Sequence, residues 1–106
     1  MSVIMTMRMK GDPSALEKVA GDDPERIRGI VEKAREHGLI AHRFYGSDDG
    51  QIMVVDEWPD AESFQKFFEA ASGDIQPLMQ EVGVDEQPQI VFWRALESHD
   101  EYGWGA

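Results

Sequence analysis

Apolar and polar side chains alternate at the start of the chain. The odd positions Val3, Met5, Met7 and Met9 are apolar, and the even positions between them are polar except for Ile4. A period of two is typical of a β-strand with one buried face. The first element is therefore predicted to be a strand.

Helical spacing follows this strand. Asp-Pro occurs at residues 12–13 and again at 23–24, and each pair combines an N-cap carboxylate with a proline suited to the first helical position. We expect a short helical turn, a break at Gly21, and then a main helix that ends before Gly38. The main helix is indicated by apolar residues at i, i+3, i+4 and i+7, which are Ile27, Ile30, Val31 and Ala34.

A β-hairpin and a second helix are predicted next. Residues 39–58 contain two apolar segments separated by a Gly-, Ser- and Asp-rich turn at residues 46–50. Asp60 is a natural N-cap for the helix that follows, and residues 73–74 (Gly-Asp) are expected to interrupt it before a further turn or two. Residues 87–98 are predicted to form a fourth strand. The apolar stripe of the second helix consists of Phe64, Phe67, Phe68 and Ala71.

The order β-α-β-β-α-β predicts a ferredoxin-like α+β fold with a four-stranded antiparallel sheet. We expect one domain over residues 1–98 and a tail over residues 99–106. Two helices can cover only one face of such a sheet, yet the third strand carries apolar residues on both faces, for example Val54 and Val55. Because a second copy packing sheet against sheet would cover the remaining face, we expect a homodimer in the form of a dimeric α+β barrel.

The composition narrows the range of partners. The net charge is −11 and Lys and Arg form no cluster, so neither a nucleic acid nor an anionic membrane surface is expected as a partner. There is no cysteine, and the three histidines share no metal-ligand spacing, so no metal site is predicted. We found neither a membrane-spanning segment nor a signal-peptide pattern, and we expect a cytoplasmic protein.

The segments "EHGLIAHRFYGSDDGQIMVVDEW" and "PDAESFQKFF" resemble the antibiotic biosynthesis monooxygenase-like family of the dimeric α+β barrel superfamily. Gly38, Tyr45, Trp58 and Phe64 occupy the places of that family's helix-ending glycine, late strand-two aromatic, strand-three tryptophan and early helix aromatic. The resemblance implies the fold described above. The activities that it implies include cofactor-independent oxidation of aromatic polyketides and haem degradation.

The chain also departs from that family. Many members carry a histidine in the second half of the helix after the tryptophan, and this chain has none there. The haem-degrading members resemble one another in an asparagine on strand one, a tryptophan in the second helix and that histidine, where this chain has Met7, Phe67 and Pro77. Haem degradation is therefore not expected, and no cofactor is predicted.

His42 is the best single candidate for proton transfer. It shares a strand face with Ile40 and Phe44, and histidine titrates near neutral pH. A histidine among apolar residues is more often part of the core, and spacing alone names no partner acid. Asp56 and Glu57 are adjacent on a strand and point to opposite faces, so we expect each to pair with an arginine of a neighbouring strand.

Two functions stay open at this stage. In the first, the protein oxidises an aromatic or activated carbonyl substrate without a metal, with His42 as the base and Arg94 or Arg8 stabilising the anion. In the second, it is a non-catalytic ligand-binding or accessory dimeric protein for a hydrophobic or aromatic small molecule. The candidates for substrate contact are aromatic, thioether or guanidinium side chains, namely Trp58, Tyr45, Arg8, Trp93 and Met7.

Overall fold

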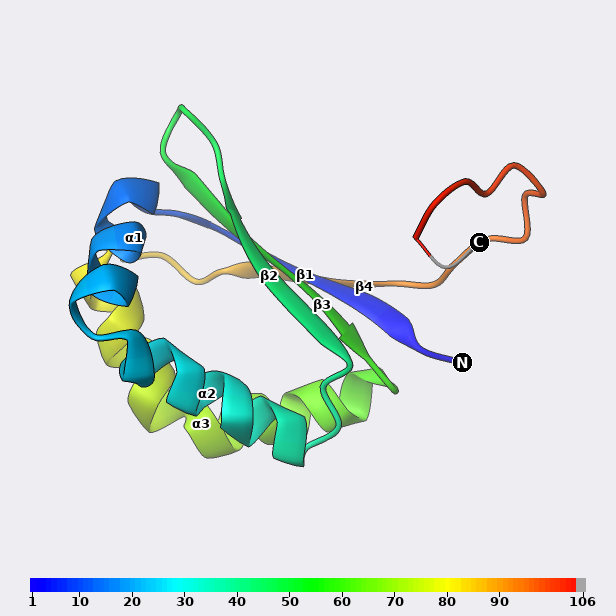
Figure 1. Ribbon diagram of the computed structural model, residues 1–106, viewed down its shortest axis with the longest axis horizontal. Helices are drawn as coiled ribbons and strands as arrows, with labels where there is room; N and C mark the ends of the chain where they lie inside the picture. Colours follow the sequence, from blue (N-terminus) through cyan, green and yellow to red (C-terminus); the bar gives the residue numbers. More distant parts are fainter. Residues whose placement is uncertain (105–106) are drawn as a thin grey trace.

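The structure is a computed structural model that describes residues 1–104. Over these residues the chain forms one antiparallel sheet in the order β2-β3-β1-β4, with helices α1, α2 and α3 on one side of it (Figure 1). The predicted ferredoxin-like fold is confirmed. The elements are β1 (Val3–Lys10), α1 (Pro13–Asp22), α2 (Pro24–Glu36), β2 (Ala41–Gly46), β3 (Gln51–Trp58), α3 (Ala61–Glu81) and β4 (Gln89–Trp93).

The alternation predicted for β1 places its odd residues against the helices. Met5, Met7 and Met9 are all buried, and the even residues face the opposite side. In the observed register Met5 lies beside Asp56 of β3, and Asp56 in turn lies beside His42 of β2. These three side chains therefore form one row on the helix-covered face.

The break between the first two helices lies at Asp23 and not at the predicted Gly21. A residue that precedes a proline is pushed out of the helical region, and Asp23 indeed has φ −142° and ψ 76° before Pro24. Asp12 caps α1 as expected, since its Oδ1 accepts from the Ser14 N–H at 2.9 Å. The side chain of Asp23 makes no such bond to α2.

The interruption predicted at residues 73–74 was wrong, because α3 is continuous from Ala61 to Glu81 and contains Pro77. A glycine costs a helix interior about 1 kcal/mol and a proline about 3 kcal/mol. Burial of apolar side chains on one face offsets this cost, at roughly 1.5–3 kcal/mol for each large side chain. The buried residues that keep this face in phase are Phe64, Phe67, Ala71, Ile75 and Leu78.

Strand β4 is shorter than predicted, covering residues 89–93 of the expected 87–98. In the antiparallel pairing with β1, Trp93 lies opposite Ile4, and Val3 is the only residue of β1 beyond that point. The following residues therefore have almost no strand left to pair with, and the chain after β4 extends away from the domain (Figure 1).

The sheet face opposite the helices is uncovered within the described chain (Figure 1). It presents Ile4, Val91 and Trp93, which are 38%, 41% and 54% exposed. A row of apolar side chains of this kind normally has a partner surface. None of the helices in residues 1–104 is both long enough and apolar enough to span a membrane.

Candidate functional site

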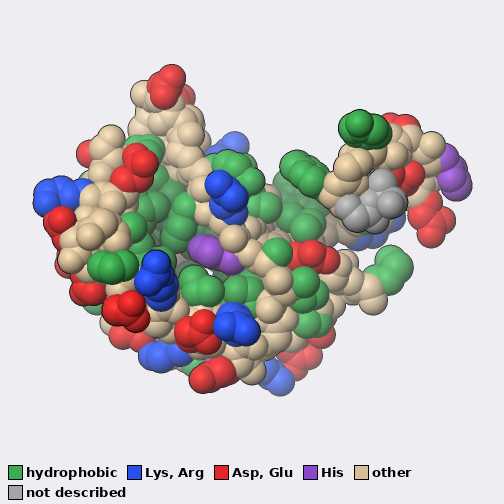
Figure 2. All heavy atoms as spheres, in the orientation of Figure 1, with side chains coloured by type: hydrophobic (Ala, Val, Ile, Leu, Met, Phe, Trp, Pro, Cys, Tyr) green, Lys and Arg blue, Asp and Glu red, His purple; other side chains and the backbone are tan. Residues whose placement is uncertain are grey.

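A cavity of about 80 Å³ lies between the covered face of the sheet and the helices. Figure 2 shows the hollow on the surface, with a histidine side chain visible inside it. Among the described residues that line it, His42 and Asp56 are the only polar ones, and the others are aliphatic, aromatic or methionine side chains. Any chemistry in this cavity therefore depends on these two residues.

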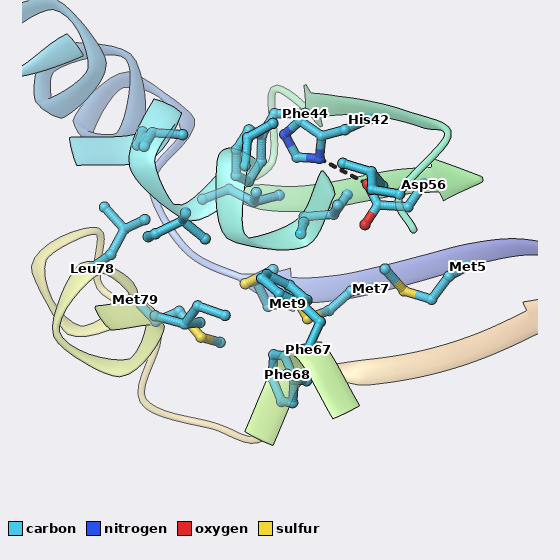
Figure 3. A pocket seen from close by; sticks show the side chains of 18 of the residues that line it. Met5, Met7, Met9, His42, Phe44, Asp56, Phe67, Phe68, Leu78 and Met79 are labelled. Carbon is cyan, nitrogen blue, oxygen red and sulfur yellow. Dashed lines mark hydrogen bonds and ion pairs between the residues drawn. The ribbon is translucent and has the colours of Figure 1, made fainter. Parts of the chain in front are cut away.

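His42 and Asp56 form a close pair across β2 and β3 (Figure 3). The His42 Nδ1 lies 2.7 Å from the Asp56 Oδ1, and the two side chains are 22% and 6% exposed. An ionised carboxylate can only accept hydrogen bonds, so the proton between the two residues resides on Nδ1. The Nε2 atom of a neutral His42 ring is then free of its proton and can accept one from a ligand.

Trp58 holds the other oxygen of the same carboxylate. Its Nε1 donates to the Asp56 Oδ2 at 3.1 Å, because residues two apart on a strand point to the same face. Trp58 is fully buried and stacks on Phe67, with ring centroids 5.5 Å apart and planes at 30°. Trp58 therefore positions Asp56 from the core side and does not line the cavity.

The remaining predicted site residues are separated by the sheet. Met7 lines the cavity with His42. Arg8 and Tyr45 lie on the uncovered face, where Arg8 donates to the Gln89 Oε1 at 2.8 Å. Trp93 is on the same face and donates from Nε1 to the Thr6 Oγ1 at 2.8 Å. In the sheet register Arg8 and Tyr45 lie beside Met53, and Trp93 lies beside Ile4. These positions are on the face opposite to His42 and Asp56, so their side chains cannot reach the cavity.

Arg94 also lies away from the cavity. It follows the last residue of β4 and is exposed. The positive charge nearest to a ligand in the cavity would therefore be a protonated His42, and not an arginine. The structure thus brings together two of the seven predicted site residues, His42 and Met7.

Asp56 lines the cavity, although the sequence predicted another role for it. The prediction that Asp56 pairs with an arginine was wrong, because its two carboxylate oxygens accept hydrogen bonds from His42 and Trp58. Glu57, on the uncovered face, accepts from the Ser2 Oγ at 2.5 Å. The pairing follows from the observed register of β2 and β3, which places His42 directly opposite Asp56.

The described residues contain no group of three or more His, Cys, Asp or Glu side chains that could hold a metal ion. In the cavity itself, His42 and Asp56 are already bonded to each other, and a usual protein metal site has three or four ligands. The arrangement is suited instead to moving a proton. The carboxylate of Asp56 orients His42, and His42 as a base lies at the wall of an apolar chamber.

No family model matches the sequence, and no curated protein matches it. Solved structures do match it. A monooxygenase from the gene ActVA-Orf6 of Streptomyces coelicolor, in complex with nanaomycin D, has a TM-score of 0.67 at 20% identity over 90% of this chain and 88% of its own. SnoaB, a cofactor-independent oxygenase from Streptomyces nogalater, has a TM-score of 0.60 at 15% identity over 94% and 98%.

A third similar structure is a dimeric ferredoxin-like protein from an uncultured marine organism. Its TM-score is 0.63 at 15% identity, and the match covers 95% of this chain and 93% of that one. Likeness at these identities establishes the fold. The chain therefore has the fold of the antibiotic biosynthesis monooxygenase structures, as the resemblance of its sequence implied.

Proposed function

We propose that the protein is a cofactor-independent monooxygenase that removes a proton from a small aromatic or activated carbonyl substrate and lets the anion react with molecular oxygen. The observation that supports this most is the His42–Asp56 pair at the wall of an apolar cavity. The likeness in fold to a cofactor-independent oxygenase gives it further support.

In the first step, the Nε2 atom of His42 accepts a proton from an acidic C–H or O–H group of the substrate. Asp56, bonded to Nδ1 at 2.7 Å, stabilises the imidazolium that forms and keeps the ring oriented. The substrate anion then lies beside the imidazolium in a chamber with apolar walls, where the attraction between opposite charges is stronger than in water.

The second step uses oxygen as the oxidant, and the atoms balance. For a methylene carbon, the carbanion transfers electrons to O₂ and forms a C–O bond, and His42 returns its proton to the resulting peroxide. Loss of water then leaves a carbonyl, so that the CH₂ group and O₂ become C=O and H₂O. Apolar walls protect such an anion from reprotonation by bulk water.

We also propose that the protein is a homodimer joined through the uncovered sheet face. The exposed apolar residues Ile4, Val91 and Trp93 support this, and a similar structure is described as dimeric. In this proposal Arg8 and Tyr45 serve the interface and not the substrate. Light scattering after size-exclusion chromatography should give the mass of two chains, and the mass of one chain would overturn the dimer.

Oxygen uptake tests the proposed activity. The purified protein is incubated with quinol, phenol and anthrone-like substrates in an oxygen electrode, next to a His42→Gln variant. We expect uptake above the uncatalysed rate that falls at least about a hundredfold in the variant. Uptake that is equal in both proteins, or none in either, would overturn the monooxygenase proposal.

The second candidate is a ligand-binding protein without catalysis. The observation in its favour is that, among the described residues, the cavity offers no donor besides His42 to stabilise an anion. Binding of an aromatic ligand without any oxygen uptake would support this candidate over the first.

A further inference from the structure

We propose that the cavity takes an uncharged, single-ring molecule with one acidic hydroxyl group, such as a simple phenol or a cyclic enol, and excludes carboxylates and fused rings. This inference rests on the proposed function and narrows its substrate class. It depends on where the polar groups lie in the cavity, on their charge and on the size of the chamber.

The polar groups gather at one end of the cavity. Figure 3 shows His42 and Asp56 together on the hairpin side, whereas Leu78 and Met79 lie at the far end and Met7 and Met9 between. A ligand oriented with its hydroxyl toward His42 keeps the rest of its surface against apolar side chains. A second polar group would be buried there without a partner, which disfavours binding strongly.

The charge of the pair selects a neutral ligand. Asp56 is buried next to His42, so an anion that approaches the neutral ring meets a carboxylate behind it. A hydroxyl group, by contrast, arrives uncharged and donates to Nε2. Only when its proton has moved to His42 does the ligand become an anion, and it is then beside a cation. Carboxylic acids are already ionised at neutral pH and lack this route.

The size of the chamber favours one ring. An apolar cavity that binds benzene has a volume of roughly 150 Å³, and the cavity here measures about 80 Å³. The flexible thioethers of Met7, Met9 and Met79 line it, and movement of such side chains can supply the difference for one ring. Two or three fused rings would require a much larger displacement of the side chains that line the cavity.

The chemistry balances for this class of substrate. In a phenol, the O–H hydrogen and one ring C–H hydrogen leave with one atom of O₂ as water. The other oxygen atom becomes the second carbonyl of a quinone, and O₂ is the oxidant. His42 accepts the hydroxyl proton in the first step and returns it to the peroxide that forms on the ring carbon.

Isothermal titration calorimetry with four ligands tests the inference. Phenol supplies one ring and one hydroxyl, toluene lacks the hydroxyl, 4-hydroxybenzoate adds a carboxylate, and 1-naphthol adds a second ring. We expect phenol to bind, and 4-hydroxybenzoate and 1-naphthol to bind at least about tenfold more weakly. In His42→Leu the ratio of phenol affinity to toluene affinity should fall about tenfold.

A measurement on the unaltered protein guards against loss of folding in His42→Leu. Phenol should shift the ¹⁵N resonance of His42 Nε2, and toluene should leave it in place. For size, Met79→Ala should raise the affinity for 1-naphthol several-fold relative to phenol, because it removes part of the apolar end of the cavity.

The outcomes separate the substrate class from the proposed activity. Selective phenol binding without oxygen uptake would keep the ligand class and overturn the monooxygenase. Oxygen uptake with carboxylates or fused rings, and none with phenols, would keep the monooxygenase and overturn the ligand class. Phenol that binds without shifting His42 Nε2 would also overturn the ligand class.

Discussion

Replacement of Asp56 by asparagine should reverse the hydrogen-bonding role of His42 while leaving the protein folded. Asp56 offers two acceptor oxygens to two donors, His42 Nδ1–H and Trp58 Nε1–H. Asparagine has one acceptor and one donor group. Both neighbours are satisfied only if the amide oxygen keeps Trp58 and the amide N–H₂ donates to His42 Nδ1. The ring proton must then move to Nε2, which faces the ligand as a donor.

The magnitude follows from the bonds that change. A hydrogen bond to a charged group contributes about 1.5–3 kcal/mol and a neutral one about 0.5–1.5 kcal/mol, so Asp56→Asn should cost about 1–3 kcal/mol. A domain with about 5–15 kcal/mol of stability remains folded, and each kcal/mol lowers Tm by about 4–8 °C. Oxygen uptake should fall about a hundredfold to ten-thousandfold, because the base has become a donor.

Long-range ¹⁵N correlation spectra identify the tautomer directly, without assuming any activity. The spectrum is recorded at a pH high enough for neutral rings. His37 is an internal control, since its Nδ1 lies 2.9 Å from the carbonyl oxygen of Lys33 and should keep its Nδ1–H tautomer in both proteins. A His42 tautomer that is the same in Asp56→Asn as in the unaltered protein would refute the orienting role of Asp56.

Three further predictions concern the interface and α3. Val91→Glu, on the uncovered face, should convert the dimer to a monomer in light scattering, whereas Ile40→Glu, equally apolar and 55% exposed but off that face, should not. Asp60 accepts a hydrogen bond from the Ser63 backbone N–H, which lowers the pKa of Asp60 below its usual 3.8. The charge of Asp60 therefore stabilises α3 fully above pH 3.8, and this stabilisation is lost as the pH falls through the lowered pKa of the folded protein. Asp60→Asn should thus be less stable than the unaltered protein in urea titrations at pH 7, and the difference should shrink below pH 3.8; a constant difference would contradict this. Pro77→Ala should raise the free energy of unfolding by up to about 3 kcal/mol, and with it the urea midpoint, because Pro77 is exposed inside a helix and leaves one backbone bond unmade. An unchanged midpoint would mean that the helix already accommodates the ring.

The fold was predictable because its patterns are periodic over whole elements. The alternation in β1 and the i, i+3, i+4 stripe of α2 both identify buried faces that the structure confirms. The continuity of α3 could also have been read, since Ile75 and Leu78 keep the phase of Phe64 and Phe67 across Gly73. The local preference of Gly73 and Asp74 against a helix predicts a break there, but the burial of the apolar face contributes more free energy.

The site was predictable only in part, because it depends on pairing between strands. The predicted turn at residues 46–50 is centred on residue 48 and would place His42 opposite Val54. In the structure Gly46 still pairs with Ile52, so the turn is centred on Asp49 and His42 lies opposite Asp56. A shift of one residue in the turn centre moves the partner by two, and this hid the His42–Asp56 pair.

The alternation of side chains along the strands has a consequence for how this sequence can diverge. Asp56 and Glu57 are neighbours in the chain, yet one belongs to the cavity and the other to the face that we assign to the partner subunit. In the two proposals made above, substitutions at Ile52, Val54 and Asp56 act on the ligand, and substitutions at the odd positions of β3 act on assembly. Relatives that keep the chemistry and change their quaternary structure should therefore vary at every second residue of this strand and remain constant at the residues between.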